Sequence, residues 1–310
     1  MKIVFMGTPA AAVPTLQKIV ARGFEVVGVY TQPDKPAGRG RKISVSPVKA
    51  FATKLEIPVF QPESLKSDEV FAGFSALKAD VVVVVAYGKI LPKRYLYEFP
   101  MGAINVHFSL LPKYRGAAPV NWAIALGENK TGVTTMLMDE GLDTGPILLS
   151  REVRINDDEN AIELTERLSE EGASLLIETL ERFGYLQPIP QDNSVATYAP
   201  VLRKSDGLID WKMKARDIVN RVRGFQPFPT AYTLLEGKKL TIWRAVVSAL
   251  PFNDFIQPGT VLMARGRDLV VSAGENTAVS ILEAQLEGRK RLSIEAFLNG
   301  VTISQGTKLG

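Results

Sequence analysis

Apolar runs of strand length alternate with amphipathic segments of helix length through the first two thirds of the chain. Residues 81–85 are five consecutive valines, a pattern typical of a strand buried on both faces of a sheet. The predicted strands cover residues 2–6, 24–30, 59–60, 80–85, 103–108, 132–138 and 147–153. The predicted helices cover residues 14–20, 68–77, 119–126 and 159–183, and a further helix starts at Ser46 and Pro47. Strands alternating with helices predict a mostly parallel, doubly wound α/β sheet of Rossmann-like architecture.

The prolines and glutamines of residues 185–193 are typical of a linker, and the pattern changes after Trp211. One predicted helix, residues 215–223, is followed by five short predicted strands at residues 231–235, 240–247, 260–264, 268–272 and 278–284. Short strands separated by glycines predict a small β-barrel, and a barrel of oligonucleotide-binding type fits this spacing. We therefore expect an α/β domain at residues 1–188, a linker at 189–205 and a barrel domain at 206–310.

The 310 residues include no cysteine and a single histidine, His107. This composition excludes a disulfide, a thiolate nucleophile, a cysteine-ligated zinc and a histidine-rich metal site, so we expect no metal. The apolar segment at the amino terminus is too short for a signal peptide, and no apolar run approaches the roughly 18 residues of a membrane span. We expect a soluble, cytoplasmic protein.

The positive charge is concentrated in the last third of the chain. Residues 1–205 hold 23 Lys and Arg against 23 Asp and Glu, whereas residues 206–310 hold 14 against 10. A basic accessory domain suits a polyanionic partner, although charge alone favours a mildly basic domain without one.

The pair Asn105 and His107 is the first candidate for chemistry. Side chains alternate along a strand, so both residues lie on one face of the predicted strand 103–108, close to its carboxyl end. Ligands of open α/β sheets bind at that edge. A lone histidine can equally be structural, but two polar residues on one strand face must find partners or face a cleft. The first turn, Gly7-Thr8-Pro9, is not a dinucleotide fingerprint, and the sequence contains no P-loop.

Asp143 is the second candidate, in a loop between two glycines and a proline at residues 141–146. It is either a turn aspartate or a carboxylate that orients His107 and favours its protonated form. Asparagine, histidine and aspartate together suit attack of an amine on a carbonyl, with Asn105 donating a hydrogen bond to the developing oxyanion. Because the chain has neither a cysteine nor a serine elbow, direct transfer fits better than an acyl-enzyme.

A basic loop is the third candidate. Residues 35–42 contain four cations and two glycines, which fits either a solvated surface loop or a mobile loop that grips phosphates.

These segments, in this order, resemble the methionyl-tRNA formyltransferase family over essentially the whole chain. The residues that carry the resemblance are 5–9, 32–40, 86–92, 105–119 and 141–146, with 198–202 and 210–211 beyond the predicted linker. Two departures stand out. Ala10 and Ala11 replace a common acidic residue and phenylalanine near the substrate, and residues 226–229 read Gln-Pro-Phe-Pro where the family has Asn-Pro-Trp-Pro.

The resemblance implies transfer of a formyl group from N10-formyltetrahydrofolate to the methionine α-amine of initiator methionyl-tRNA, for translation initiation. It implies that the C-terminal barrel holds the tRNA, and we expect the protein to act as a monomer. The site residues that it implies are the catalytic trio Asn105, His107 and Asp143, the folate-contacting loop Ser109, Leu110, Leu111 and Pro112, and the tRNA-contacting residues Arg39, Arg41 and Lys42.

Two other functions fit part of these observations. A formyltransferase for a small amine, such as a sugar nucleotide or glycinamide ribonucleotide, shares the asparagine, histidine and aspartate set but not the combination of basic loop and basic barrel. A catalytically silent RNA-binding protein explains the charges but not the intact catalytic set.

Overall fold

The computed structural model describes residues 1–37, 42–251 and 256–310 and forms two compact units. The first unit comprises Met1–Pro119, Lys130–Arg154 and Thr165–Ala199, and the second comprises Val120–Asn129, Ile155–Leu164 and Pro200–Gly310. Within the described part of the chain, no helix is long and apolar enough to cross a membrane.

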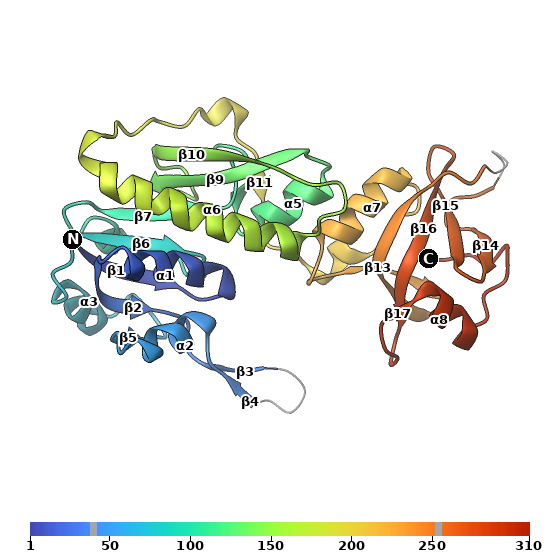
Figure 1. Ribbon diagram of the computed structural model, residues 1–310, viewed down its shortest axis with the longest axis horizontal. Coiled ribbons are helices and arrows are strands. Elements are labelled where there is room, and N and C mark those ends of the chain that lie inside the picture. The colour runs from blue at the N-terminus through green and yellow to red at the C-terminus, as the bar shows by residue number, and fades with distance from the viewer. Residues whose placement is uncertain (38–41, 252–255) are drawn as a thin grey trace. The chain divides into compact units, whose positions relative to one another are not determined.

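A seven-stranded sheet is the centre of the first unit, in the order β10-β9-β7-β6-β1-β2-β5 (Figure 1). Its strands are β1 (Lys2–Gly7), β2 (Glu25–Tyr30), β5 (Val59–Phe60), β6 (Val81–Val85), β7 (Ala103–His107), β9 (Lys130–Leu137) and β10 (Ile147–Arg154). The neighbouring strands β5, β2, β1, β6 and β7 are all parallel. Strand β9 runs antiparallel to both β7 and β10. The predicted mostly parallel α/β sheet is therefore confirmed.

Helices cover both faces of this sheet. The side chains of Ile3, Phe5 and Val83 pack into one apolar core with α1 (Val13–Ala21), α2 (Pro47–Lys54) and α6 (Ala161–Arg182). The alternate side chains of β1 and β6 pack into a second core with α3 (Asp68–Ser75) and α4 (Lys93–Leu96). Both faces of the parallel strands are thus buried, which is why their sequences are almost continuously apolar.

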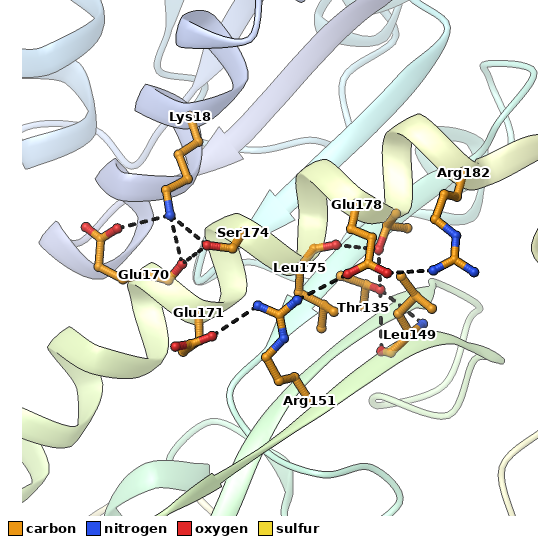
Figure 2. Close-up of polar contacts among 11 residues, drawn as sticks. Lys18, Thr135, Leu149, Arg151, Glu170, Glu171, Ser174, Leu175, Glu178 and Arg182 are labelled. Atoms are coloured by element: carbon orange, nitrogen blue, oxygen red, sulfur yellow. Dashed lines mark hydrogen bonds and ion pairs between the residues drawn. The ribbon is translucent and has the colours of Figure 1, made fainter.

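Polar contacts fasten α6 to the sheet (Figure 2). Arg151 of β10 pairs with Glu171 and Glu178, each at 3.1 Å. These groups are about one-third exposed or more, so the pairs add little stability. A buried contact lies beside them, where the hydroxyls of Thr135 and Thr179 are 2.8 Å apart. Thr179 donates its own proton to the Leu175 carbonyl, so Thr135 is the donor in this pair.

The second unit holds an antiparallel, barrel-like sheet in the order β12-β13-β16-β15-β14, with a short strand β17 paired to β16. Its strands are β12 (Ala231–Leu235), β13 (Lys238–Ser248), β14 (Val261–Arg265), β15 (Asp268–Ala273), β16 (Thr277–Leu286) and β17 (Leu292–Ser293). One apolar core lies between this sheet and the helices α7 (Ala215–Gly224) and α8 (Ile294–Gly300). The predicted barrel domain is confirmed, and α8 was not predicted because seven residues are too few for a clear helical period.

Several short elements complete the fold. They are β3 (Lys35–Ala37), β4 (Lys42–Ser44), β8 (Arg115–Gly116), β11 (Tyr198–Ala199), α5 (Pro119–Ala125) and the 3-10 turns Ala10–Ala12, Phe183–Tyr185, Asn193–Val195 and Lys204–Gly207. Residues 35–42 were predicted as a loop, but β3 and β4 pair as an antiparallel ribbon. The predicted linker also contains paired backbone, since Ile189 bridges Ile147 and β11 pairs with β8.

The Thr135–Thr179 pair gives a test of how α6 is held. Replacing Thr179 with Val keeps the volume but leaves the buried Thr135 hydroxyl with only the Leu149 carbonyl, 3.5 Å away, as acceptor, which should cost about 1–3 kcal/mol. We expect urea denaturation to show that loss for Thr179→Val, and a loss of about 0.8 kcal/mol for Thr179→Ser, which keeps the hydroxyl but loses one buried methyl group. Equal stability of the two variants would contradict this assignment.

Candidate active site

Strand β7 presents Asn105 and His107 on one face of the sheet. Ile104 and Val106, which alternate with them, pack into the core shared with α6. Asn105 and His107 therefore face the opposite side, with 9% and 6% of their surface exposed. At this point in the sheet, β7 has parallel β6 on one side and antiparallel β9 on the other.

The His107 ring is fixed from both sides. Its Nε2 lies 2.9 Å from the backbone carbonyl of Tyr114. A carbonyl can only accept, so Nε2 carries a proton and donates it. Nδ1 then faces the Asp143 carboxylate, whose Oδ2 is 3.7 Å away. That distance is too long for a direct hydrogen bond, so the two groups face each other without one.

The backbone conformation of Asp143 orients its side chain toward His107. Its φ of +52° lies in the left-handed region, which favours glycine, asparagine and aspartate among all residues. The carboxylate Oδ2 accepts a 2.7 Å hydrogen bond from the backbone N–H of Gly116. The turn aspartate of this loop is Asp139 instead, which accepts hydrogen bonds from the Gly141 N–H and the Thr144 hydroxyl. Asp143 is thereby left to face His107.

The Asn105 side chain makes no hydrogen bond to any of the residues that the structure describes, although it is almost buried. An amide in such a position normally has a partner, because burying an unpaired polar group costs free energy. The Asn105 amide therefore has N–H donors available to a carbonyl oxygen beside it, and Nδ1 of His107 can act as a second donor only when the ring carries both protons.

The loop after β7 is held internally. Ser109 is fully buried and donates its hydroxyl to the Lys113 carbonyl at 2.6 Å. The Thr134 hydroxyl donates to the Ser109 carbonyl and accepts from the Leu111 N–H. Leu111 is buried, while Leu110 and Pro112 are partly exposed, and the Leu111–Pro112 peptide bond is cis. The loop thus offers partly apolar surface next to His107.

Two residues that sequence reasoning missed complete this region. Arg115 is 2% exposed, and its guanidinium donates to the side-chain oxygen of Gln191 at 2.8 Å and 3.1 Å. Gln191 falls in the stretch predicted as linker, and no periodicity or motif marks it in the sequence. Only its pairing with a distant loop reveals it.

Asp34, which precedes the basic loop, is bonded to residues at the edge of the sheet. Lys49 contacts Asp34 at 2.6 Å, and Gln61 donates to the same carboxylate at 2.8 Å. These hydrogen bonds from Lys49 and Gln61 hold the pKa of Asp34 below its usual range. Arg39 and Arg41 lie outside the described residues, and Lys42 is the first residue of β4.

Metal ligands do not gather at this site. In the portions of the chain at residues 1–37, 42–251 and 256–310, no group of three or more histidine, aspartate or glutamate residues is placed to hold an ion.

Comparison with known families defines the class of protein. Residues 1–180 match the formyl transferase family, and residues 201–302 match the formyl transferase C-terminal domain. The protein is a formyl transferase. Full-length relatives named methionyl-tRNA formyltransferase include those of Geobacter metallireducens (48% identical, 100% of this chain and 99% of the relative) and Caldanaerobacter subterraneus (49%, 100% and 100%). The chain belongs to the methionyl-tRNA formyltransferase family.

Solved structures share the fold. WlaRD, a sugar 3N-formyl transferase, has a TM-score of 0.66 at 22% identity, over 94% of this chain and 99% of that chain. HypX from Aquifex aeolicus, in complex with tetrahydrofolic acid, has a TM-score of 0.64 at 18% identity. The match to HypX covers 99% of this chain and 50% of that one.

The geometry at Asp143 predicts the effect of Asp143→Asn. Asparagine tolerates the left-handed backbone, and its amide oxygen can still accept from Gly116, so the fold should persist. The charge facing His107 disappears, and formyl transfer should fall by about 10²–10⁴. Steady-state rates and thermal melting of both proteins check this. Wild-type turnover in the variant would remove Asp143 from the mechanism.

Proposed function

We propose that this chain, as a cytoplasmic monomer, transfers the formyl group of N10-formyltetrahydrofolate to the α-amine of initiator methionyl-tRNA. The residues 1–188 would carry the chemistry, 189–205 would link the domains, and 206–310 would hold the tRNA. The observation that supports it most is the Asn105 amide, nearly buried yet without a protein partner, beside a histidine whose Nδ1 faces a carboxylate.

In the proposed reaction, the neutral amine attacks the formyl carbon and a new C–N bond forms. Asn105 donates to the oxygen that becomes negative, and protonated His107 donates to it through Nδ1. The bond between the formyl carbon and N10 then breaks. The amine loses one proton and N10 gains one, so the atoms balance. Asp143, which faces His107, relays the proton of the amine through a water at the site.

The loop Ser109, Leu110, Leu111 and Pro112 is the proposed folate contact. The partly exposed Leu110 and Pro112 suit the flat, partly apolar ring system of a folate. The buried Ser109 and Leu111 would act by holding the loop in place, since Ser109 is bonded to Lys113 and Leu111 to Thr134.

The catalytic roles are tested by two truncations. Asn105→Ala removes one oxyanion donor and should lower kcat by about 10²–10³. His107→Ala should cost on the order of 10²–10⁴, because it also removes the group that handles the proton. The assay follows labelled formyl-methionyl-tRNA from purified enzyme and both substrates.

Lys54→Ala, at an exposed position of α2, serves as the control and should be fully active. If the wild-type chain forms no formyl-methionyl-tRNA under these conditions, the proposed function is wrong. If it does so and Asn105→Ala matches it, only the role of Asn105 is wrong.

Arg39, Arg41 and Lys42 are the proposed tRNA contacts of the basic loop. Binding of a polyphosphate releases counterions, so each lost phosphate contact flattens the dependence of affinity on salt. For Arg39→Ala/Arg41→Ala we expect weaker tRNA binding and a log–log salt slope reduced by about 1.5. Lys54→Ala/Lys66→Ala removes the same charge at exposed positions and should leave the slope unchanged. An unaltered slope in the arginine variant would show that the loop does not touch phosphates.

A further inference from the structure

The side chain of Gln191 uses all of its hydrogen-bonding capacity next to the candidate site. Its Nε2 donates to the backbone carbonyls of Asp143, at 2.8 Å, and Gly145, at 2.7 Å. Its Oε1 accepts twice from Arg115. A glutamine amide has two N–H donors and two acceptor lone pairs, so this one residue spans the Asp143 loop and the loop after β7.

Arg115 keeps Gln191 in that orientation. The buried guanidinium has no carboxylate partner among the residues that the structure describes, and it is satisfied by amide oxygens from Gln191 and, at 2.9 Å, from Asn193. A buried charge without such partners is costly. Flipping the Gln191 amide would turn its NH₂ group toward Arg115 and its oxygen toward two carbonyls, which excludes the alternative orientation.

The stretch of chain that contains Gln191 also positions the Tyr114 carbonyl, which accepts the hydrogen bond from His107. We name residues 189–199 the strap. Within it, Thr197 accepts from the Tyr114 N–H through its hydroxyl and from the Arg115 N–H through its carbonyl, both at 2.8 Å. Tyr114 in turn provides the carbonyl that binds Nε2 of His107. The strap therefore fixes the backbone on both sides of the His107–Asp143 pair.

We propose that Gln191 is a positioning residue for formyl transfer, one that sets the Asp143 carboxylate against His107. The inference rests on the proposed function of the site. Gln191 contacts neither reacting group through its side chain. It acts on the backbone of Asp143, whose left-handed conformation is easily lost when its carbonyl is released. A displacement of about 1 Å in such a pair can lower the rate about 10²-fold.

The test variant is Gln191→Met, which keeps the length of the side chain and removes every hydrogen bond. Gln187→Met is the matched control, because Gln187 lies just before the strap, is exposed and makes no hydrogen bond to the described residues. We expect kcat to fall about 10–10²-fold in Gln191→Met with both KM values within about twofold, and the control to match wild type. Wild-type kcat in Gln191→Met, or a loss confined to KM, would overturn the proposal.

A double-mutant cycle separates positioning from a merely structural role. If Gln191 acts through Asp143, Gln191→Met should cost less than about threefold in an Asp143→Asn background, since residues acting as one unit are not additive. A full, multiplicative loss in that background would show an independent effect. Should Gln191→Met fail to fold, Gln191→Glu keeps the acceptor for Arg115 and replaces only the donor to the Asp143 and Gly145 carbonyls, so the same losses are expected from it.

A second readout needs no turnover. His107 is the only histidine, so its ring protons can be followed by NMR without assignment by mutation. The ring-proton chemical shifts of Gln191→Met should depart from wild type in the direction of Asp143→Asn, whereas those of Gln187→Met should coincide with wild type. Ring-proton shifts unchanged in Gln191→Met overturn the positioning role even if the enzyme accepts a different amine. Absence of product from wild type with methionyl-tRNA bears only on the proposed function.

Discussion

The hydrogen bond from His107 Nε2 to the Tyr114 carbonyl decides how the site can work. It places one proton on the nitrogen that points away from Asp143 and leaves Nδ1 as the nitrogen that can gain or release a second. Tyr114 reaches this position at a φ of +61°, a conformation that costs a non-glycine residue on the order of 1–3 kcal/mol. The surrounding hydrogen bonds of the loop after β7 and of the strap maintain it.

Asp143 comes to the site by a route that strand order alone does not suggest. Strand β9 runs antiparallel to β7, so the chain leaves it beside Ala103, at the end of β7 away from His107. The Met138 N–H donates to the Ala103 carbonyl, and the loop then folds back over the face that carries Asn105 and His107. Gly145 permits this path, because a Cβ there would lie 1.8 Å from the Leu137 carbonyl.

A segment with the composition of a linker is, in this structure, part of the support of the site. Its backbone pairs with β8 and β10, and its side chains satisfy a buried arginine. Proline and polar residues are compatible with a free linker and with a segment that packs against the site. Neither kind of segment has a periodic pattern in its sequence. The ordered contacts with Arg115 and Thr197 distinguish the two.

The features that follow from local periodicity could be predicted from the amino-acid sequence. The valine run at 81–85 indicated a doubly buried strand, alternation placed Asn105 and His107 on one face, and Ser46 was a correct helix cap, since its hydroxyl accepts from the Lys49 N–H. Repeating patterns encode which face is apolar, so these features need no knowledge of distant contacts.

Three features emerge only from the folded molecule: the proton on Nε2 of His107, the approach of Asp143 to that ring, and the contact of Gln191 with the Asp143 backbone. Gln191 is 48 residues from Asp143 and 76 from Arg115, and these contacts depend on loop backbones without a period. Hydrogen bonds of this kind form wherever folded loops happen to bring a donor and an acceptor together, and no pattern along the chain records them.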